Sequence, residues 1–192
     1  MPRIIDYPHV VEQMAVDGLV SLYPNSGAFG FPPGAATRAV GWVGADDPSI
    51  RPEARALTRP VAPPCESTLA AMGARAWKEL LAGDVWVLPK SHWAYELQFG
   101  SHEWMPGLLR EVGVDPQVLE TRHDGTALAF DSGETAAFER LVAGLLGRLL
   151  GSDYMLAWLG RPALCTVHHH KQLWWTTTDA GVYEGLERIA GR

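Results

Sequence analysis

Lysine is scarce in this chain, and the basic residues form no cluster. The lysines are Lys78, Lys90 and Lys171, and the formal net charge of the 192 residues is −6. Proteins that bind nucleic acid neutralise its phosphates with clustered lysine and arginine. We therefore expect no nucleic-acid partner.

Cysteine is also scarce. Cys65 and Cys165 are far apart in the sequence and are its two cysteines. Small secreted domains that depend on disulfides carry many more of them. We therefore expect no disulfide framework, and we predict that the chain works in a reducing cytoplasm.

Long apolar runs are absent as well. A helix that spans a bilayer needs about 20 continuous apolar residues, and no segment approaches that length. Residues 1–6 lack the charged head and apolar core of a signal peptide. The sequence therefore predicts no contact with a membrane.

Enzyme signatures are missing too. The glycine-rich stretch 24–34 is not followed by the Gly-Lys-Ser/Thr ending of a phosphate-binding loop. What remains is ordinary globular composition, with 47% hydrophobic and 20% charged residues, which is enough apolar material for a core. The length favours one domain. The preference for arginine and alanine over lysine and isoleucine is typical of GC-rich bacterial genomes.

Hydrophobic periodicity predicts a mixture of strands and helices. Strands are expected over 19–23, 37–43, 85–88, 92–99, 126–130, 153–159 and 164–178. Helices are expected over 7–16, 66–82, 103–112, 133–150 and 182–190. The polar, proline-rich stretch 44–64 is predicted to be a long surface loop.

Two segments share the order strand, helix, strand, strand. They span 37–99 and 126–178, and the helix at 103–112 joins them. This order predicts a single α+β domain over 1–192, with helices on one face of a largely antiparallel sheet. An internal duplication of the shared unit is one interpretation. The other sheet face would then be available to form a groove.

The stretch 164–178 carries more chemically capable side chains than any other. It is rich in β-branched and aromatic residues, so we predict one long strand. Side chains alternate between the two faces of a strand. One face would therefore carry His168, His170, Gln172 and Trp174, with His169 on the other.

Two histidines on one strand face suit a metal ion. His168 and His170 would lie about 6.5–7 Å apart along the strand, and imidazole is a common ligand of zinc and iron. A third ligand would come from His92, Glu96 or His123. A divalent zinc or iron ion at this pair is one hypothesis for a cofactor.

A groove that binds its ligand without a metal is the other hypothesis. In the duplicated arrangement the strand at 92–99 is equivalent to the histidine strand, so the two polar faces would converge. Trp93, Trp174 and Trp175 lie in these two strands, and tryptophan is favoured in clefts and interfaces. The same pattern also fits a solvent-facing sheet surface or a surface for a partner protein.

Candidate nucleophiles have simpler explanations. Cys165 shares its strand face with Val167, His169 and Leu173, away from the other two histidines, and is expected to be buried and inert. Ser132 lies between Asp131 and Glu134, which are spaced as a variant capping box. We assign neither a catalytic role.

We therefore expect a bacterial, cytoplasmic α+β binding module that holds a small molecule or a protein partner in a groove lined by histidine and aromatic residues. The residues expected to bind the ligand are His92, Glu96, Gln98, Gln172 and Trp174. The first alternative is a metal-dependent hydrolase or oxygenase that uses His168 and His170 with a carboxylate. The second is an immunity or toxin-neutralising protein. Homodimerisation is left open.

Overall fold

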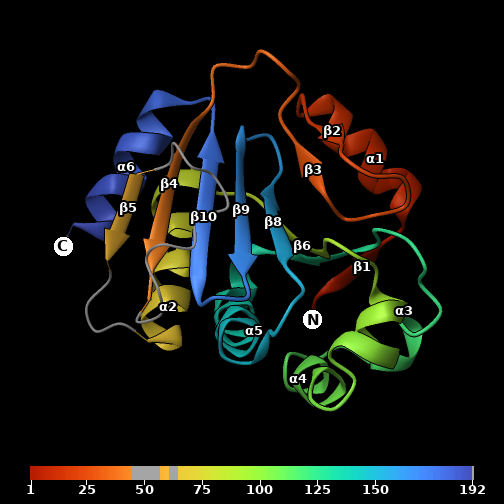
Figure 1. Cartoon of the computed structure of the whole chain (residues 1–192). Helices are drawn as coiled ribbons and strands as arrows, with labels where there is room; N and C mark the ends of the chain where they lie inside the picture. The colour runs from red at the N-terminus through yellow and green to blue at the C-terminus, as the bar shows by residue number, and fades with distance from the viewer. Residues whose placement is uncertain (45–56, 61–64, 192) are drawn as a thin grey trace.

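A computed structural model describes residues 1–44, 57–60 and 65–191 (Figure 1). Its central sheet has eight strands, which are, in spatial order, β1 (Arg3–Ile5), β7 (Ala127–Phe130), β6 (Val85–Pro89), β8 (Tyr154–Trp158), β9 (Ala163–His168), β10 (Gln172–Thr177), β4 (Arg38–Val43) and β5 (Leu57–Pro60). Neighbouring strands are antiparallel except β4 and β5, which are parallel. The predicted α+β class with a largely antiparallel sheet is confirmed. The loop predicted over 44–64 is wrong at Leu57–Pro60, which forms β5, and residues 45–56 and 61–64 lie outside the described residues.

Six α-helices surround the sheet in the described part of the chain. They are α1 (Tyr7–Val16), α2 (Glu66–Ala76), α3 (Trp93–Tyr95), α4 (Met105–Glu111), α5 (Thr135–Arg148) and α6 (Ala180–Ala190). Turns of π-helix extend α2 over Trp77–Leu81 and α3 over Glu96–Gly100. Among these helices, none is both long and apolar enough to cross a membrane.

One face of the sheet is covered by α2, α5 and α6, which lie behind it in Figure 1. The periodicity of α5 explains this position, because its apolar side chains recur on one side of the helix. Those buried in the core are Phe138, Leu141, Val142, Leu145 and Leu146. Alternate side chains of β9 and β10, such as Cys165 and Trp175, point into the same core.

The opposite face is covered in part by α1 and by a separate two-stranded ladder, β2 (Val20–Ser21) and β3 (Phe29–Gly30). Met14 of α1 and Phe29 of β3 form a second, smaller core with β6, β7 and β8. This core extends to Leu164 of β9. Beyond it, the side chains of β9 and β10 on this face form the floor of the site described below.

The expected strand over 92–99 is wrong, because this segment forms α3 and its π-helical extension. Trp93 and Leu97, four residues apart, are buried, which is the spacing of one helix face. The imidazole of His92 accepts a hydrogen bond from the backbone N–H of Tyr95 (3.1 Å) and so caps the helix.

The single long strand expected over 164–178 is also wrong. The segment is a hairpin, in which Gln172 of β10 pairs with His168 of β9. Residues 169–171 turn the chain, and Lys171 takes the left-handed backbone conformation that the turn requires (φ 57°). The first proposed repeat unit thus ends in a helix and the second in a hairpin. The structure does not show the duplication.

Candidate functional site

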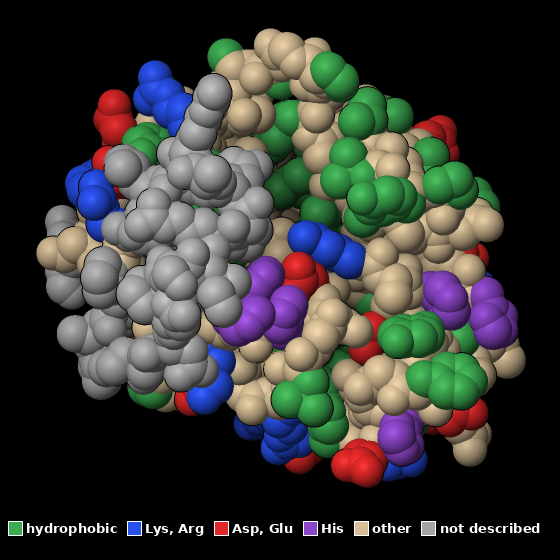
Figure 2. Space-filling model, in the orientation of Figure 1, with side chains coloured by type: hydrophobic (Ala, Val, Ile, Leu, Met, Phe, Trp, Pro, Cys, Tyr) green, Lys and Arg blue, Asp and Glu red, His purple; other side chains and the backbone are tan. Residues whose placement is uncertain are grey.

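A cavity of about 460 Å³ opens on the partly covered face of the sheet. Its floor comes from β8, β9 and β10, and its wall comes from segment 22–37, which includes β3. The lining side chains include Phe29, Phe31, Met155, Leu164, Thr166, Trp174, Thr176 and Lys90. Figure 2 shows this hollow, with hydrophobic side chains inside it and histidine and basic side chains at its edge. We call it the groove.

Trp174 forms an aromatic floor because the neighbouring strand carries a glycine. Trp174 pairs with Gly41 of β4, and a Cβ atom at Gly41 would lie 2.6 Å from the indole ring. The indole therefore occupies the space of the missing side chain. Its Nε1 donates a hydrogen bond to Oε1 of Gln172 (2.7 Å), and both side chains are buried. The orientation of the ring is thus fixed by packing and by a hydrogen bond.

The wall of the groove is held against the sheet by close backbone contacts. A Cβ atom at Gly27 would lie 2.2 Å from the carbonyl oxygen of Pro89, and one at Gly125 would lie 2.5 Å from the carbonyl oxygen of Ser26. Glycine is required at such approaches. Further along, the backbone N–H of Phe29 donates to the sulfur of Met155 (3.4 Å). The wall is therefore anchored to the ends of β6 and β7 and to β8.

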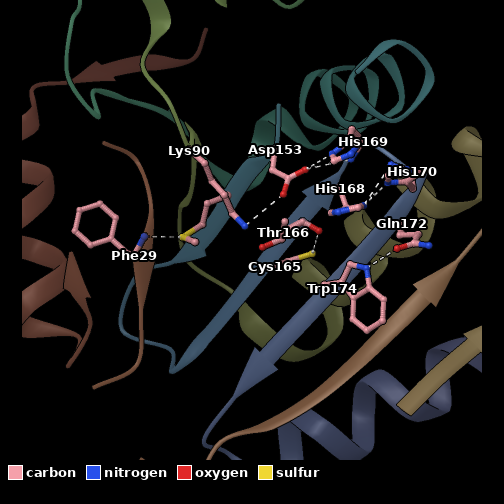
Figure 3. A network of polar contacts seen from close by, with 11 residues as sticks. Phe29, Lys90, Asp153, Cys165, Thr166, His168, His169, His170, Gln172 and Trp174 are labelled. Atoms are coloured by element: carbon pink, nitrogen blue, oxygen red, sulfur yellow. Dashed lines mark hydrogen bonds and ion pairs between the residues drawn. The ribbon is translucent and has the colours of Figure 1, made fainter. Parts of the chain in front are cut away.

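A chain of polar contacts leads from Lys90 at one end of the groove to the hairpin turn (Figure 3). Lys90, which lines the groove, places Nζ 3.6 Å from Oδ2 of Asp153. Oδ1 of Asp153 lies 2.9 Å from Nδ1 of His169 and accepts a hydrogen bond from the backbone N–H of His169 (3.2 Å). The groove and the hairpin turn are thus connected through one carboxylate.

The hairpin turn brings three imidazoles into contact. The ring centroids of His168, His169 and His170 lie 4.2–5.0 Å apart, and Nδ1 of His168 is 3.3 Å from Nδ1 of His170. His168 is 7% exposed, whereas the other two rings are half-buried. Desolvation lowers the pKa of His168 to about 4, although Asp153 acts in the opposite direction. His168 is therefore a neutral imidazole near pH 7.

The structure brings together four of the residues predicted from the histidine stretch. His168, Gln172 and Trp174 share a sheet face, as expected, although on two paired strands instead of one. His170 lies in the turn, so it reaches His168 directly and not at the expected distance along a strand.

The residues predicted from 92–99 lie elsewhere. Glu96 is buried and accepts hydrogen bonds from the hydroxyls of Ser91 (2.6 Å) and Ser101 (3.1 Å). Gln98 donates to the carbonyl of Glu120. The prediction that this segment forms a strand face converging with the histidines is wrong, because the segment is helical and its polar groups hold that helical region together.

His123, the last third-ligand candidate, packs against His92 with ring centroids 5.4 Å apart. The three tryptophans predicted for the groove lie in different places. Trp174 lines the groove, but Trp93 and Trp175 are buried in the core covered by the helices. The expected aromatic character of the groove therefore comes from one of the three predicted tryptophans, together with phenylalanines of the wall.

The simpler explanations of the candidate nucleophiles are confirmed. Cys165 is fully buried, and desolvation raises the pKa of its thiol well above the ordinary value. Asp131 and Glu134 form a capping box around Ser132 ahead of α5.

Sequence reasoning missed Lys90, Asp153 and His169 as partners. Lys90 follows β6 and Asp153 precedes β8, and the register of these two paired strands places the two residues side by side. The backbone N–H of Lys90 donates a hydrogen bond to the carbonyl of Asp153 (2.9 Å). No local pattern carries that information, because it depends on which strands pair.

Comparison of this chain with protein-family models, with curated proteins and with solved structures finds no match.

Proposed function

We propose that this protein is a binding module for a small, partly aromatic organic anion, which the groove holds against Trp174. The observation that carries the proposal is the groove itself, a cavity of about 460 Å³ with an indole floor and Lys90 at one end. Its volume falls within the range of about 300–1,000 Å³ that is usual for sites of small ligands.

The lining supports an aromatic or flat apolar ligand. Trp174, Phe29 and Met155 offer apolar surface on the floor and the wall. Burying apolar surface contributes roughly 25 cal/mol per Å² to binding before the costs of association. An indole whose orientation is already fixed loses little freedom when a flat ligand stacks on it.

Lys90 favours a negatively charged group on the ligand. An ammonium has three N–H donors, so Lys90 can bind a carboxylate of the ligand while keeping its contact with Asp153. The hydroxyls of Thr166 and Thr176 line the same cavity and can form further hydrogen bonds. We therefore expect a carboxylate or a similar anion near the end of β6.

The cellular compartment and the kind of binding partner are also part of this proposal. Cys65 and Cys165 are free thiols, which supports a reducing compartment such as the cytoplasm. In the described part of the chain, no feature singles out the toxin-neutralising alternative, which stays a prediction.

A pair of matched probes tests the proposal. 2-Naphthoate and its neutral counterpart 2-naphthamide differ in the carboxylate, and both can be titrated by ligand-observed NMR. We expect saturable 1:1 binding with a preference of about tenfold for the acid, since a charge-assisted hydrogen bond contributes about 1.5 kcal/mol. In Lys90→Met the preference should disappear.

Variants that fill the groove provide the spatial control. Thr166→Trp on the floor and Ala35→Trp in the wall should each abolish binding, because both side chains line the cavity. Thr178→Trp adds the same side chain at an exposed position just beyond β10 and should bind as the wild type does. Binding retained in both filled variants, or absent from the wild type, would refute the proposal.

A further inference from the structure

The histidines of the hairpin turn form a second cluster, outside the lining of the groove. His168, His169 and His170 each offer a ring nitrogen, and these three atoms lie within 4.8 Å of one another. The cluster includes the end of a central strand, because His168 is the last residue of β9. Its first member is therefore fixed by the sheet, whereas the other two belong to the turn.

The spacing of two of these nitrogens matches that of metal ligands. Zinc binds imidazole nitrogen at about 2.0–2.1 Å with tetrahedral angles, which places two ligand nitrogens about 3.3–3.4 Å apart. Nδ1 of His168 and Nδ1 of His170 are separated by 3.3 Å. A metal ion can therefore replace the proton that the two atoms share without separating the rings.

Asp153 orients the imidazole ring of His169. Its Oδ1 lies 2.9 Å from Nδ1 of His169 and also accepts the backbone N–H of the same residue. Histidines that bind metals usually direct their other ring nitrogen to a carboxylate, which fixes the ring and the tautomer. Because Nδ1 of His169 is engaged by Asp153, Nε2 is the atom that this ring can offer to a metal ion.

The charges around the turn are balanced. Lys90 lies 3.6 Å from Asp153, and Lys171 lies 3.1 Å from Glu66. Each ammonium thus has a carboxylate beside it, which offsets its repulsion of a cation. Ligands that are all imidazoles select zinc, nickel, cobalt or copper over magnesium and calcium, which prefer oxygen.

We propose that His168, His169 and His170 bind a divalent transition metal such as zinc, with Asp153 as the hydrogen-bond acceptor that positions His169. Three histidines leave one position of a tetrahedral ion for water or another ligand. The site does not depend on the groove, and its test uses the metal alone.

The binding test uses the tag-free full chain after treatment with chelator. Zinc is titrated by calorimetry, and cobalt is titrated by the visible absorption of its tetrahedral complexes. We expect one ion per chain. Removing a ligand in His168→Ala or His170→Ala should weaken binding by more than about 100-fold, because even loss of an outer carboxylate costs about 10–100-fold. Asp153→Asn should show that smaller loss.

His9→Gln is the matched control, because His9 lies in α1 and its side chain is 60% exposed. It should leave the affinity unchanged. The proposal is overturned if the wild type does not bind one ion, or if His168→Ala and His170→Ala bind as tightly as His9→Gln does.

Three consecutive histidines can also attract metals in an unfolded chain, so thermal unfolding provides a second test. A metal that binds the folded site raises the unfolding temperature, and one that prefers the unfolded chain lowers it. We expect zinc to raise it in the wild type and in His9→Gln. A lowered or unchanged temperature in the wild type would overturn the proposal.

A third measurement requires no variant. Long-range ¹H–¹⁵N NMR spectra distinguish the two ring nitrogens of each histidine. On zinc binding, the shifts should report coordination through Nδ1 of His168 and of His170 and through Nε2 of His169. Coordination through Nδ1 of His169 would contradict the positioning role of Asp153.

Discussion

His168 is a histidine held in its neutral form by burial. Its folded pKa is about 4, below the ordinary value of 6.5. The unfolded state therefore binds more protons between about pH 6.5 and about pH 4, and stability falls as the pH decreases through this range. We expect the metal-free protein to lose about 1–2 kcal/mol there, less than the full shift implies, because the ring lies beside the half-buried turn.

Urea unfolding at several pH values, compared between the wild type and His168→Gln, measures this contribution. The stability difference between the two should shrink as the pH falls from 6.5 towards 4. His9→Gln should follow the wild type, since His9 is exposed. A difference that stays constant with pH would show that His168 does not titrate in this way.

Gly41 is the second residue with a sharp prediction. A Cβ atom there would meet the indole of Trp174 at 2.6 Å, and overpacking of this kind costs about 1–3 kcal/mol. Gly41→Ala should therefore lower the free energy of unfolding by about 2 kcal/mol, as measured by urea denaturation.

Gly107 is the matched control for this change. It lies inside α4, and a Cβ atom there meets nothing within 4 Å. Gly107→Ala should raise stability by about 0.5–1 kcal/mol, because alanine is the better helix former. If both substitutions had the same effect, the indole would not occupy the space beside β4.

Individual residues could be predicted where the signal was local. The capping box of Asp131 and Glu134 and the burial of Cys165 follow from a few neighbouring positions. The pairing of Lys90 with Asp153 does not, because it depends on the register of two distant strands, in which Pro89 faces Tyr154, 65 positions further along the chain. The sequence therefore predicted only part of the candidate site, and the contact between Lys90 and Asp153 was not predicted.

The periodicity predicted the helices that cover the larger core, but it failed for 92–99 and for 164–178, and β5 lies in the stretch predicted as a loop. In 92–99, Trp93, Tyr95, Leu97 and Phe99 alternate as in a strand, but Tyr95 and Phe99 are exposed and the other two have helical spacing. The hairpin turn carries no glycine or asparagine at Lys171, its left-handed position. The usual signals of a turn were therefore missing.

The start of α6 gives a prediction for a single element. The side chain of Asp179 accepts a hydrogen bond from the backbone N–H of Val182 (3.0 Å) and caps the helix. Asp179→Ala should cost about 1 kcal/mol, the usual effect of losing such a cap. Equilibrium denaturation measures the change.

Thr178→Ala alters the preceding, exposed residue and should change stability by less than about 0.5 kcal/mol. Equal effects of the two substitutions would mean that the hydrogen bond to Val182 does not stabilise the helix.

At the scale of the whole molecule, the described residues form two cores of unequal size on the two faces of one sheet. The larger contains α2, α5 and α6, and the smaller is built around Met14, Phe29 and the inner strands. Regions with fewer buried contacts open more readily. We therefore expect faster amide hydrogen exchange in α1 and in segment 22–37 than in β8 and β9.

Met14→Ala and Leu141→Ala test this order of opening. Met14 belongs to the smaller core and Leu141 to the larger, and both are fully buried. Each truncation should cost about 2–5 kcal/mol in its own core. Exchange measured by mass spectrometry should accelerate mainly over 7–37 for Met14→Ala and over the whole sheet for Leu141→Ala. The same pattern in both variants would contradict two separable cores.

The fold class could be predicted from the order of elements, but the order of strands could not. The N-terminal β1 forms an edge beside β7, and β7 lies between β1 and β6. These positions depend on long-range pairing, which leaves no periodic trace in the sequence. The duplication was inferred from the order of elements in the two segments, and the structure shows different endings in each.

The wall of the groove, segment 22–37, is attached to the central sheet in a way that allows this segment to be replaced. Segment 22–37 contributes no strand to the central sheet, and it is anchored where Gly27 crosses Pro89 and Ser26 crosses Gly125. A new loop that kept these crossings could be grafted between α1 and β4 without changing any strand pair of that sheet. The floor would then act as a constant scaffold, and ligand selectivity could be redesigned, or could diverge during evolution, through one short cassette of residues.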